Sequence, residues 1–177
     1  KAALESLREP LEEGKVILSR ASGAVEYPAK FQLIAALNPC PCGFSGSDEV
    51  VCNCSHQDKH RYHAKTSGPL LDRIDMRVIL RTVDPTQERL GEDIQSKSVK
   101  KRVDRAYQLI QGSGKSTLQP SVVGLLNRSI QRLKLSMRSF DRVAKVGRSI
   151  AALDGRDVVG PDDIAEALNY RIQNPYS

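Results

Sequence analysis

The sequence predicts an α/β region over residues 1–88, followed by an all-helical region over residues 89–177. Two apolar runs in the first region, residues 31–37 and 76–83, have the length of strands, and the first is apolar enough to be covered on both faces of a parallel sheet. From about residue 95 the apolar spacing is helical to the end of the chain. The domain boundary is placed between these patterns.

The first thirty residues predict a helix followed by a hairpin. Leucines recur at helical spacing over residues 2–13, and Gly14 follows at a position suited to a C-terminal cap. Pro10 is expected to bend or restart this helix. Residues 16–20 and 24–27 are two short extended runs separated by a small, glycine-containing segment, which is typical of a hairpin.

The remaining elements are predicted to be helical, apart from the strand at residues 76–83. Residues 56–66 are basic and compatible with a helix, and Pro69 can open a further short one. The later helices are expected at residues 95–111, 121–135, 138–154 and 161–172. One face of the third gathers Phe140, Val143, Ala144, Gly147, Ile150 and Ala151. The last helix begins with Asp162 and Asp163, which suits the helix dipole, and is expected to bury Ile164, Ala167 and Leu168.

Composition limits the class of protein and its partners. A chain of 177 residues with 40% apolar content can bury a substantial core. The sequence contains no run of about 20 apolar residues and no signal-peptide pattern at its start, so we expect a cytoplasmic protein without a membrane partner. The formal net charge of +6 favours a polyanionic partner. Aromatic residues are scarce, which argues against binding built mainly on base stacking.

Four cysteines form two Cys-x-Cys pairs, and four thiolates in one short loop match a closed tetrahedral zinc site. These residues are Cys40, Cys42, Cys52 and Cys54. Disulfides would need an oxidising compartment, and separate buried thiols are the other alternative. The nearby histidines, His56, His60 and His63, share a helix face and are expected at the surface, although one could replace a cysteine in the metal shell.

Two strings identify a family. Residues 38–43 read Asn-Pro-Cys-Pro-Cys-Gly, and residues 67–75 read Ser-Gly-Pro-Leu-Leu-Asp-Arg-Ile-Asp. Together with a later basic helix over residues 136–153, they resemble the magnesium-chelatase-like branch of AAA+ ATPases. The cysteine pairs are similar to those of the ComM-type competence proteins within that branch. The resemblance covers essentially the whole chain.

The resemblance implies the C-terminal part of an AAA+ P-loop NTPase core followed by a helical lid of the magnesium-chelatase C-terminal type. It implies a parent protein that binds ATP and Mg²⁺ and forms a ring, with six subunits expected. For the ComM type it further implies a helicase that promotes branch migration on branched or single-stranded DNA during natural transformation and recombination.

The resemblance also assigns roles in nucleotide hydrolysis. Asn38 matches sensor 1, where a carboxamide orients the attacking water, although an asparagine after a strand is otherwise an ordinary turn former. Arg73 matches the arginine finger that is offered to the neighbouring subunit's nucleotide, so its guanidinium should be displayed at an exposed edge. The alternative for Arg73 is a salt bridge to Asp72 or Asp75.

Five further residues have roles implied by the resemblance. Arg138 resembles sensor 2 at the head of the lid helix, with Arg142, one turn later, as the competing choice; either could instead belong to a solvated face. The hairpin lies where this branch places a pre-sensor 1 hairpin, so Lys15, Arg20 and Lys30 could contact DNA phosphates. An ordinary hairpin at a sheet edge is the alternative.

The sequence departs from the family pattern in two places. It contains no Gly-x-x-x-x-Gly-Lys-Ser/Thr loop after a strand and no acidic strand end for magnesium, so we expect the C-terminal part of such a protein, inactive alone. Gly112-Ser-Gly-Lys-Ser-Thr117 is no substitute, because Leu109 stands where the first glycine is needed and a helix precedes it. The link between residues 111 and 121 is also shorter than usual in the family.

Two other functions stay open at this point. One is a metal-chelatase ATPase subunit acting on a porphyrin, against which the cysteine loop argues. The other is a stand-alone zinc-bearing nucleic-acid-binding module that does not use ATP. A basic helix, whose cations are Lys97, Lys100, Lys101, Arg102 and Arg105, could contribute to binding, but a solvated face is the commoner outcome for such a run.

Overall fold

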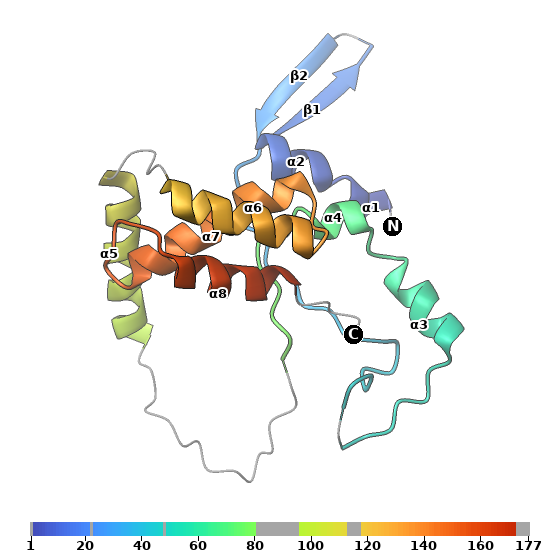
Figure 1. Ribbon diagram of the computed structural model, residues 1–177. Helices are drawn as coiled ribbons and strands as arrows, with labels where there is room; N and C mark the ends of the chain where they lie inside the picture. The colour runs from blue at the N-terminus through green and yellow to red at the C-terminus, as the bar shows by residue number, and fades with distance from the viewer. Residues whose placement is uncertain (1, 22, 48, 81–95, 113–117, 173–177) are drawn as a thin grey trace. The chain divides into compact units, whose positions relative to one another are not determined.

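The computed structural model describes residues 2–21, 23–47, 49–80, 96–112 and 118–172 (Figure 1). The chain divides into two compact units, the first ending at Ile74 and the second beginning at Asp75. The predicted boundary, between residues 88 and 89, lies outside the described residues. Within the described part, every helix is too short or too polar to cross a bilayer.

Two short helices open the first unit, α1 (Ala2–Glu5) and α2 (Arg8–Glu13). One helix over residues 2–13 was expected to bend or restart at Pro10, and the interruption falls earlier, at residues 6 and 7. Pro10 fits in the first turn of α2 because amides there have no partner within the helix. Gly14 adopts φ 66° and donates its N–H to the Pro10 carbonyl, so the predicted cap is confirmed.

The predicted hairpin is confirmed as β1 (Lys15–Arg20) paired antiparallel with β2 (Gly23–Pro28). The base of the hairpin is closed by the Ala29 N–H, which donates to the Gly14 carbonyl at 2.7 Å. Because side chains alternate along strands, the opposed pairs Val16–Tyr27 and Leu18–Val25 share one face. These two strands form the only sheet within the described residues.

The two predicted core strands are not present as strands. Residues 31–37 and 76–80 are irregular, while residues 81–83 lie outside the described part of the chain. Their apolar side chains are uncovered: Ile34 is 86% exposed and Leu80 is 89% exposed. A strand needs a neighbouring backbone to complete its hydrogen bonds, and no described segment lies beside these runs as a paired strand.

Two further helices complete the first unit, α3 (His56–His63) and α4 (Gly68–Leu71). A capping box begins α3: the Ser55 side chain accepts the Asp58 N–H, and the Asp58 carboxylate accepts the Ser55 N–H. The helix ends three residues before the predicted limit of residue 66. The short helix expected at Pro69 is confirmed as α4.

The four predicted helices of the second unit are confirmed, with ends that agree within three residues. They are α5 (Ser96–Gly112), α6 (Pro120–Arg132), α7 (Met137–Leu153) and α8 (Pro161–Ile172). Their core contains Val122, Leu126, Ile130, Val143, Val146, Ala151, Val159, Ile164, Ala167 and Leu168. At Gly147 a Cβ atom would lie 3.0 Å from Ile164 Cδ1, so the glycine allows α7 and α8 to pack closely.

The start of α8 is held by a buried carboxylate. Asp163 is 2% exposed and accepts hydrogen bonds from the Arg156 guanidinium at 2.8 and 2.5 Å and from the Gly160 N–H at 2.8 Å. The Arg156 hydrogen bonds are the largest cause of a lowered Asp163 pKa. The sequence predicted an acidic first turn here. In the structure, one of its two aspartates, Asp163, is buried, while Asp162 is exposed.

Candidate metal centre

The two Cys-x-Cys pairs converge in one loop of the first unit. The sulfur of Cys40 lies 3.3 Å from that of Cys42 and 3.7 Å from that of Cys52, and the Cys42 and Cys52 sulfurs are 3.6 Å apart. All four sulfurs, including that of Cys54, lie within 4.8 Å of one another. All four cysteines are free thiols.

These distances fit a tetrahedral metal site. Four sulfurs at about 2.3 Å from one zinc ion would be separated by about 3.8 Å. Disulfide formation would bring two sulfurs to about 2.05 Å, and none of the three sulfur–sulfur distances given above approaches that value. The four cysteines therefore make a possible metal site with the donor set that zinc prefers in structural centres.

The first pair is presented by a tight turn. The Gly43 N–H donates to the Cys40 carbonyl, and Gly43 adopts φ 86°, a conformation that side-chain-bearing residues rarely reach. The Ser45 N–H points at the Cys40 sulfur, 3.3 Å away. Backbone amides are thus directed at the site where thiolate charge would accumulate.

The thiols have unequal acidities. The Phe44 backbone amide and the hydrogen bond from Cys40 lower the pKa of Cys42 to about 6. At Cys54, the Cys42 amide favours the thiolate, but hydrogen bonds to Cys42 and burial outweigh it and raise the pKa to about 12. Neighbouring sulfurs resist a second negative charge, and a bound cation would relieve that repulsion.

A histidine braces the loop without joining the cysteine cluster. His63 Nε2 lies 2.9 Å from the Pro39 carbonyl and donates a hydrogen bond to it, since a carbonyl can only accept. His56 and His60 are exposed on α3. Within the described residues, the one group of possible metal ligands consists of the four cysteines alone.

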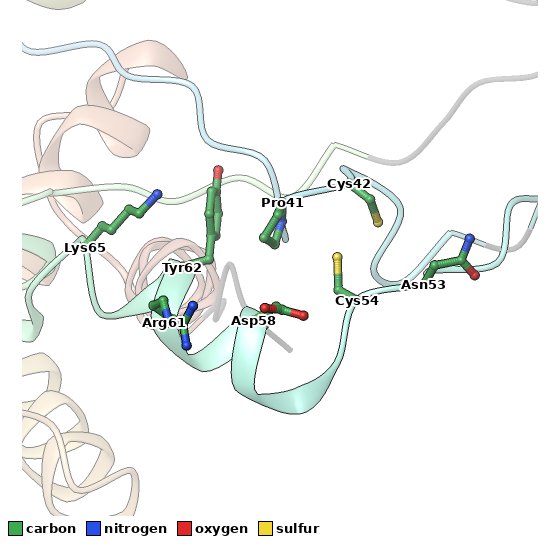
Figure 2. Close-up of a pocket in the computed structure, with 8 residues that line it drawn as sticks. All are labelled: Pro41, Cys42, Asn53, Cys54, Asp58, Arg61, Tyr62 and Lys65. Carbon is green, nitrogen blue, oxygen red and sulfur yellow. The ribbon is translucent and has the colours of Figure 1, made fainter.

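An open pocket of about 670 Å³ lies against this centre. Figure 2 shows Cys42 and Cys54 on one side of this pocket. Residues of α3, and Lys65 just after that helix, lie on the other side. Its further lining residues are Pro41, Asn53, Asp58, Arg61, Tyr62 and Lys65. Sequence reasoning did not assign these residues to a pocket; for the four at residues 58–65, the basic character of residues 56–66 was the only signal.

Arg73 does not show the exposure that an arginine finger needs. Its side chain is buried, and the residue is 8% exposed. Nε donates to the Arg8 carbonyl at 3.1 Å, Nη1 to the Pro69 carbonyl at 2.8 Å, and Nη2 to the Glu12 carboxylate. The expected alternative partners were Asp72 and Asp75, whereas the ion pair is made by Glu12, 61 residues earlier.

The other residues assigned to nucleotide sensing differ in their surroundings. Asn38 is exposed at the end of the irregular segment, two residues before Cys40. Arg138 is exposed in the first turn of α7. Arg142, one turn later, forms an ion pair with Asp75, which belongs to the same unit. The sequence left the two arginines as competing choices, and the structure gives them different exposure: Arg138 is exposed and Arg142 is half-buried.

The three predicted DNA-contacting residues divide between the two ends of the hairpin, with Lys15 and Lys30 at its base and Arg20 at its far end. Lys15 bonds to Glu26 on the opposite strand at 2.9 Å, and this hydrogen bond is the main reason that the Lys15 pKa is raised. Arg20 is exposed at the far end of β1, five residues away and thus about 17 Å along the strand. Lys30 is exposed just after β2, and its Cγ lies 3.5 Å from the Cβ position of Gly14.

Comparison with known proteins gives two family matches. Residues 1–88 match the family described as magnesium chelatase, subunit ChlI, and residues 113–171 match the family described as its C-terminal region.

Three relatives align along almost the whole chain. An uncharacterised protein of Mycobacterium tuberculosis is 37% identical over 96% of this chain and 37% of its own length. Competence protein ComM of Haemophilus influenzae is 34% identical, and the YifB protein of Salmonella typhimurium is 33% identical; each alignment covers 95% of this chain and 36% of the relative. The chain thus spans little more than a third of the length of these relatives.

Proposed function

The chain belongs to the magnesium chelatase family, and from this premise we propose that it forms part of an AAA+ ATPase that moves on DNA. Its proposed contribution is sensor 1, an arginine finger, sensor 2 and the DNA-facing hairpin. The parent protein would bind ATP and Mg²⁺, form a hexameric ring and act as a branch-migration helicase in transformation or recombination. The similarity to a competence protein supports this choice within the family.

The observation that carries the proposal is the uncovered state of residues 31–37 and 76–80. Both runs have the composition of core strands, yet most of their apolar side chains are exposed and neither run pairs as a strand within the described residues. Such segments are explained if a larger parallel sheet takes them up. In the proposed parent, that sheet would also carry the phosphate-binding loop.

Asn38 suits the role of sensor 1 by its position. It follows directly on the first of the two strand-like runs, and in open α/β sheets ligands bind at the carboxyl ends of strands. Its carboxamide can accept a hydrogen bond from water and donate one to a phosphate oxygen at once. The nucleotide supplies the phosphoryl group, and Asn38 would orient the attacking water toward it.

The arginine-finger role of Arg73 requires a rearrangement. Its guanidinium must leave Glu12 and two backbone carbonyls to reach a neighbouring subunit's nucleotide. A planar guanidinium can then stabilise charge on the transferring phosphoryl group. For sensor 2 we favour Arg138, which is exposed in the first turn of α7, over Arg142, whose side chain is half-buried against Asp75.

The cysteine cluster is proposed to hold a structural Zn²⁺. Four cysteine ligands close the coordination shell, so no position is left for a reacting water. The metal would fix the loop between Asn38 and α3, which is too short to bury a core of its own.

A subunit-mixing assay of the parent ATPase tests the proposal. Arg73→Ala protomers should lack DNA-stimulated turnover, and so should protomers whose phosphate-loop lysine is changed to alanine. Mixed rings should recover part of the activity, because some interfaces then combine an intact loop with an intact Arg73. Arg61→Ala, at an exposed arginine of the same unit, serves as the control. Full activity of Arg73→Ala homogeneous rings would refute the finger assignment.

The metal-chelatase and binding-module alternatives are separated from the helicase by two measurements. The DNA affinity of a chelatase subunit should not depend steeply on salt concentration, because such a subunit makes no specific contacts with DNA phosphates. A stand-alone module should bind DNA with equal affinity whether or not a phosphate-loop-bearing polypeptide and ATP are present.

A further inference from the structure

Most of the chain's net positive charge lies on one helix. α5 carries five cations, Lys97, Lys100, Lys101, Arg102 and Arg105, and one acid, Asp104, for a net +4. The whole chain has 27 cations and 21 acids, so the other 160 residues have 22 and 20, a net +2. The basic character of this protein is therefore a local feature of α5.

Three of these cations form a straight outward stripe. Lys97, Lys101 and Arg105 recur every four residues, so they lie on one side of the helix at steps of about 6 Å along its axis. All three are exposed. The packed side is marked by Ala106, which is buried where α5 contacts α7. Ala106 lies five residues after Lys101, and so about 140° around the helix from it.

Arg102, on the same helix, differs from these three cations because its side chain has a structural role. Arg102 donates to the Leu153 carbonyl and to the Asp154 carboxylate, both at 2.9 Å, and so ties α5 to the end of α7. Lys97, Lys101 and Arg105 make no ion pair or side-chain hydrogen bond with any described residue. Their charges are available to a ligand.

We propose that Lys97, Lys101 and Arg105, here called the α5 stripe, bind the phosphate backbone of DNA. This rests on the proposed function only in taking DNA as the partner; it needs no nucleotide turnover. Regularly spaced cations on a rigid helix suit a regularly spaced polyanion, and such contacts position a protein without reading sequence. The α5 stripe is a second contact surface, on the helical unit, in addition to the hairpin of the first unit.

A nucleic-acid backbone fits this helix better than an anionic membrane does. A helix lying on a membrane needs its apolar face and its cations on the same side of the interface. The exposed apolar residues of α5 are Val99, Val103 and Tyr107. Val103 follows Lys101 by two residues and therefore lies about 200° around the helix from it. A surface that meets the stripe cannot also cover the apolar residues.

A salt series with labelled duplex DNA tests the inference on the full chain without nucleotide. The triple variant Lys97→Gln/Lys101→Gln/Arg105→Gln removes the stripe with a residue that favours helices. Log affinity decreases linearly with log salt concentration. If three phosphate contacts are lost, the magnitude of this negative slope should decrease by about 2.7, at about 0.9 per contact. Affinity at low salt should fall at least tenfold, equally for two unrelated duplex sequences.

A matched control removes the same charge elsewhere on the helical unit. Arg128→Gln/Arg132→Gln/Lys145→Gln changes three exposed cations of α6 and α7, and the slope should stay near that of the unaltered chain. A third variant, Lys97→Arg/Lys101→Arg, keeps the charge and should keep the affinity. Helix content by circular dichroism verifies that all variants are folded.

Three results would overturn the inference. Equal losses in the stripe and control variants would mean that only net charge matters. An unchanged salt slope in the stripe variant, together with a weakened Arg20→Gln variant, would refute the stripe and leave the proposed function standing. Absence of DNA binding by the unaltered chain, with stripe-dependent binding to phosphatidylserine vesicles, would refute both DNA contacts.

Discussion

At the scale of single residues, the cysteine loop places four soft ligands so close together that each thiolate disfavours the ionisation of its neighbours. The pKa of Cys42 is lowered to about 6, whereas hydrogen bonds to the neighbouring cysteines and burial raise the pKa of Cys54 to about 12. Four thiolates so close together need a cation to be stable as a group. Among the described residues of the loop, Cys40 is the one buried apolar side chain, so a bound ion would add substantially to its rigidity.

The first prediction concerns the metal. Protein purified without added metal should contain about one zinc per chain, the stoichiometry of a four-cysteine site. Cys52→Ser should abolish stable binding, because three thiolates and a hydroxyl make a weaker shell. Ser45→Ala, which changes a neighbouring side chain whose hydroxyl bonds to no cysteine, should retain the metal. Elemental analysis measures all three. Metal-free protein with four reduced thiols would contradict the assignment.

The second prediction concerns Asp163. Asp163→Asn removes a buried carboxylate that is bonded to Arg156 and Gly160, and should lower the free energy of unfolding of the helical unit by about 2 kcal/mol at pH 7. Asp162→Asn, at its exposed neighbour, should cost much less. Urea unfolding followed by circular dichroism gives both values.

The effect of Asp163 should depend on pH in a defined direction. Its pKa is lowered in the folded state, so its stabilisation is complete above the unfolded value of about 3.9 and is lost as pH falls through the folded pKa. The difference between the unaltered chain and Asp163→Asn should therefore shrink below about pH 4. A difference that grows on acidification would contradict this account.

At the scale of elements, local signals were sufficient for helices and for the hairpin. Gly14 caps α2 and Pro161 begins α8, and each of these acts within a few residues. The hairpin was predictable because its partner strands are adjacent in the chain. Residues 31–37 also have the composition of a strand, but strand formation depends on a distant neighbour that their own sequence cannot specify.

The same distinction applies to the candidate site. The cysteines could be grouped from sequence because all four fall within fifteen residues, 40–54. The partner of Arg73 could not, since Glu12 lies 61 residues away. Lys15 and Arg20 were grouped as DNA contacts by their charge, but cross-strand pairing with Glu26 and the length of the hairpin give them different surroundings.

The third prediction separates these two hairpin cations. Arg20→Gln should weaken DNA binding more than Lys15→Gln, because the Lys15 charge is already matched by Glu26 whereas Arg20 forms no ion pair with a described residue. Affinities at one low salt concentration are sufficient to compare them. Equal losses would mean that the Lys15–Glu26 pair opens when DNA binds.

At the scale of the whole molecule, the uncovered strand-like runs should govern solution behaviour. Ile34 and Leu80 expose most of their surface, and the other exposed large apolar residues of both runs expose between 46% and 60% of theirs. Burial of apolar area is favourable by about 25 cal/mol per Å². These runs should therefore seek other polypeptide, either a completing sheet or another copy of the chain.

The fourth prediction follows from this exposure. The isolated chain should bind a hydrophobic dye and self-associate at micromolar concentration, and Ile34→Lys/Leu80→Lys should reduce both. Within the parent protein, amides of residues 31–37 should become protected from hydrogen exchange as they join the sheet. Light scattering and mass-resolved exchange provide the measurements. Rapid exchange of these amides in the parent would contradict the proposed core.

One hydrogen bond gives the loop a mechanical consequence. His63 on α3 holds the carbonyl of Pro39, the residue between Asn38 and Cys40. A displacement of the Pro39 carbonyl must therefore either stretch that bond or move α3 with it. The positions of Asn38 and α3 are therefore coupled through Pro39. Cys40, the first residue of the cysteine cluster, is the next residue in the chain.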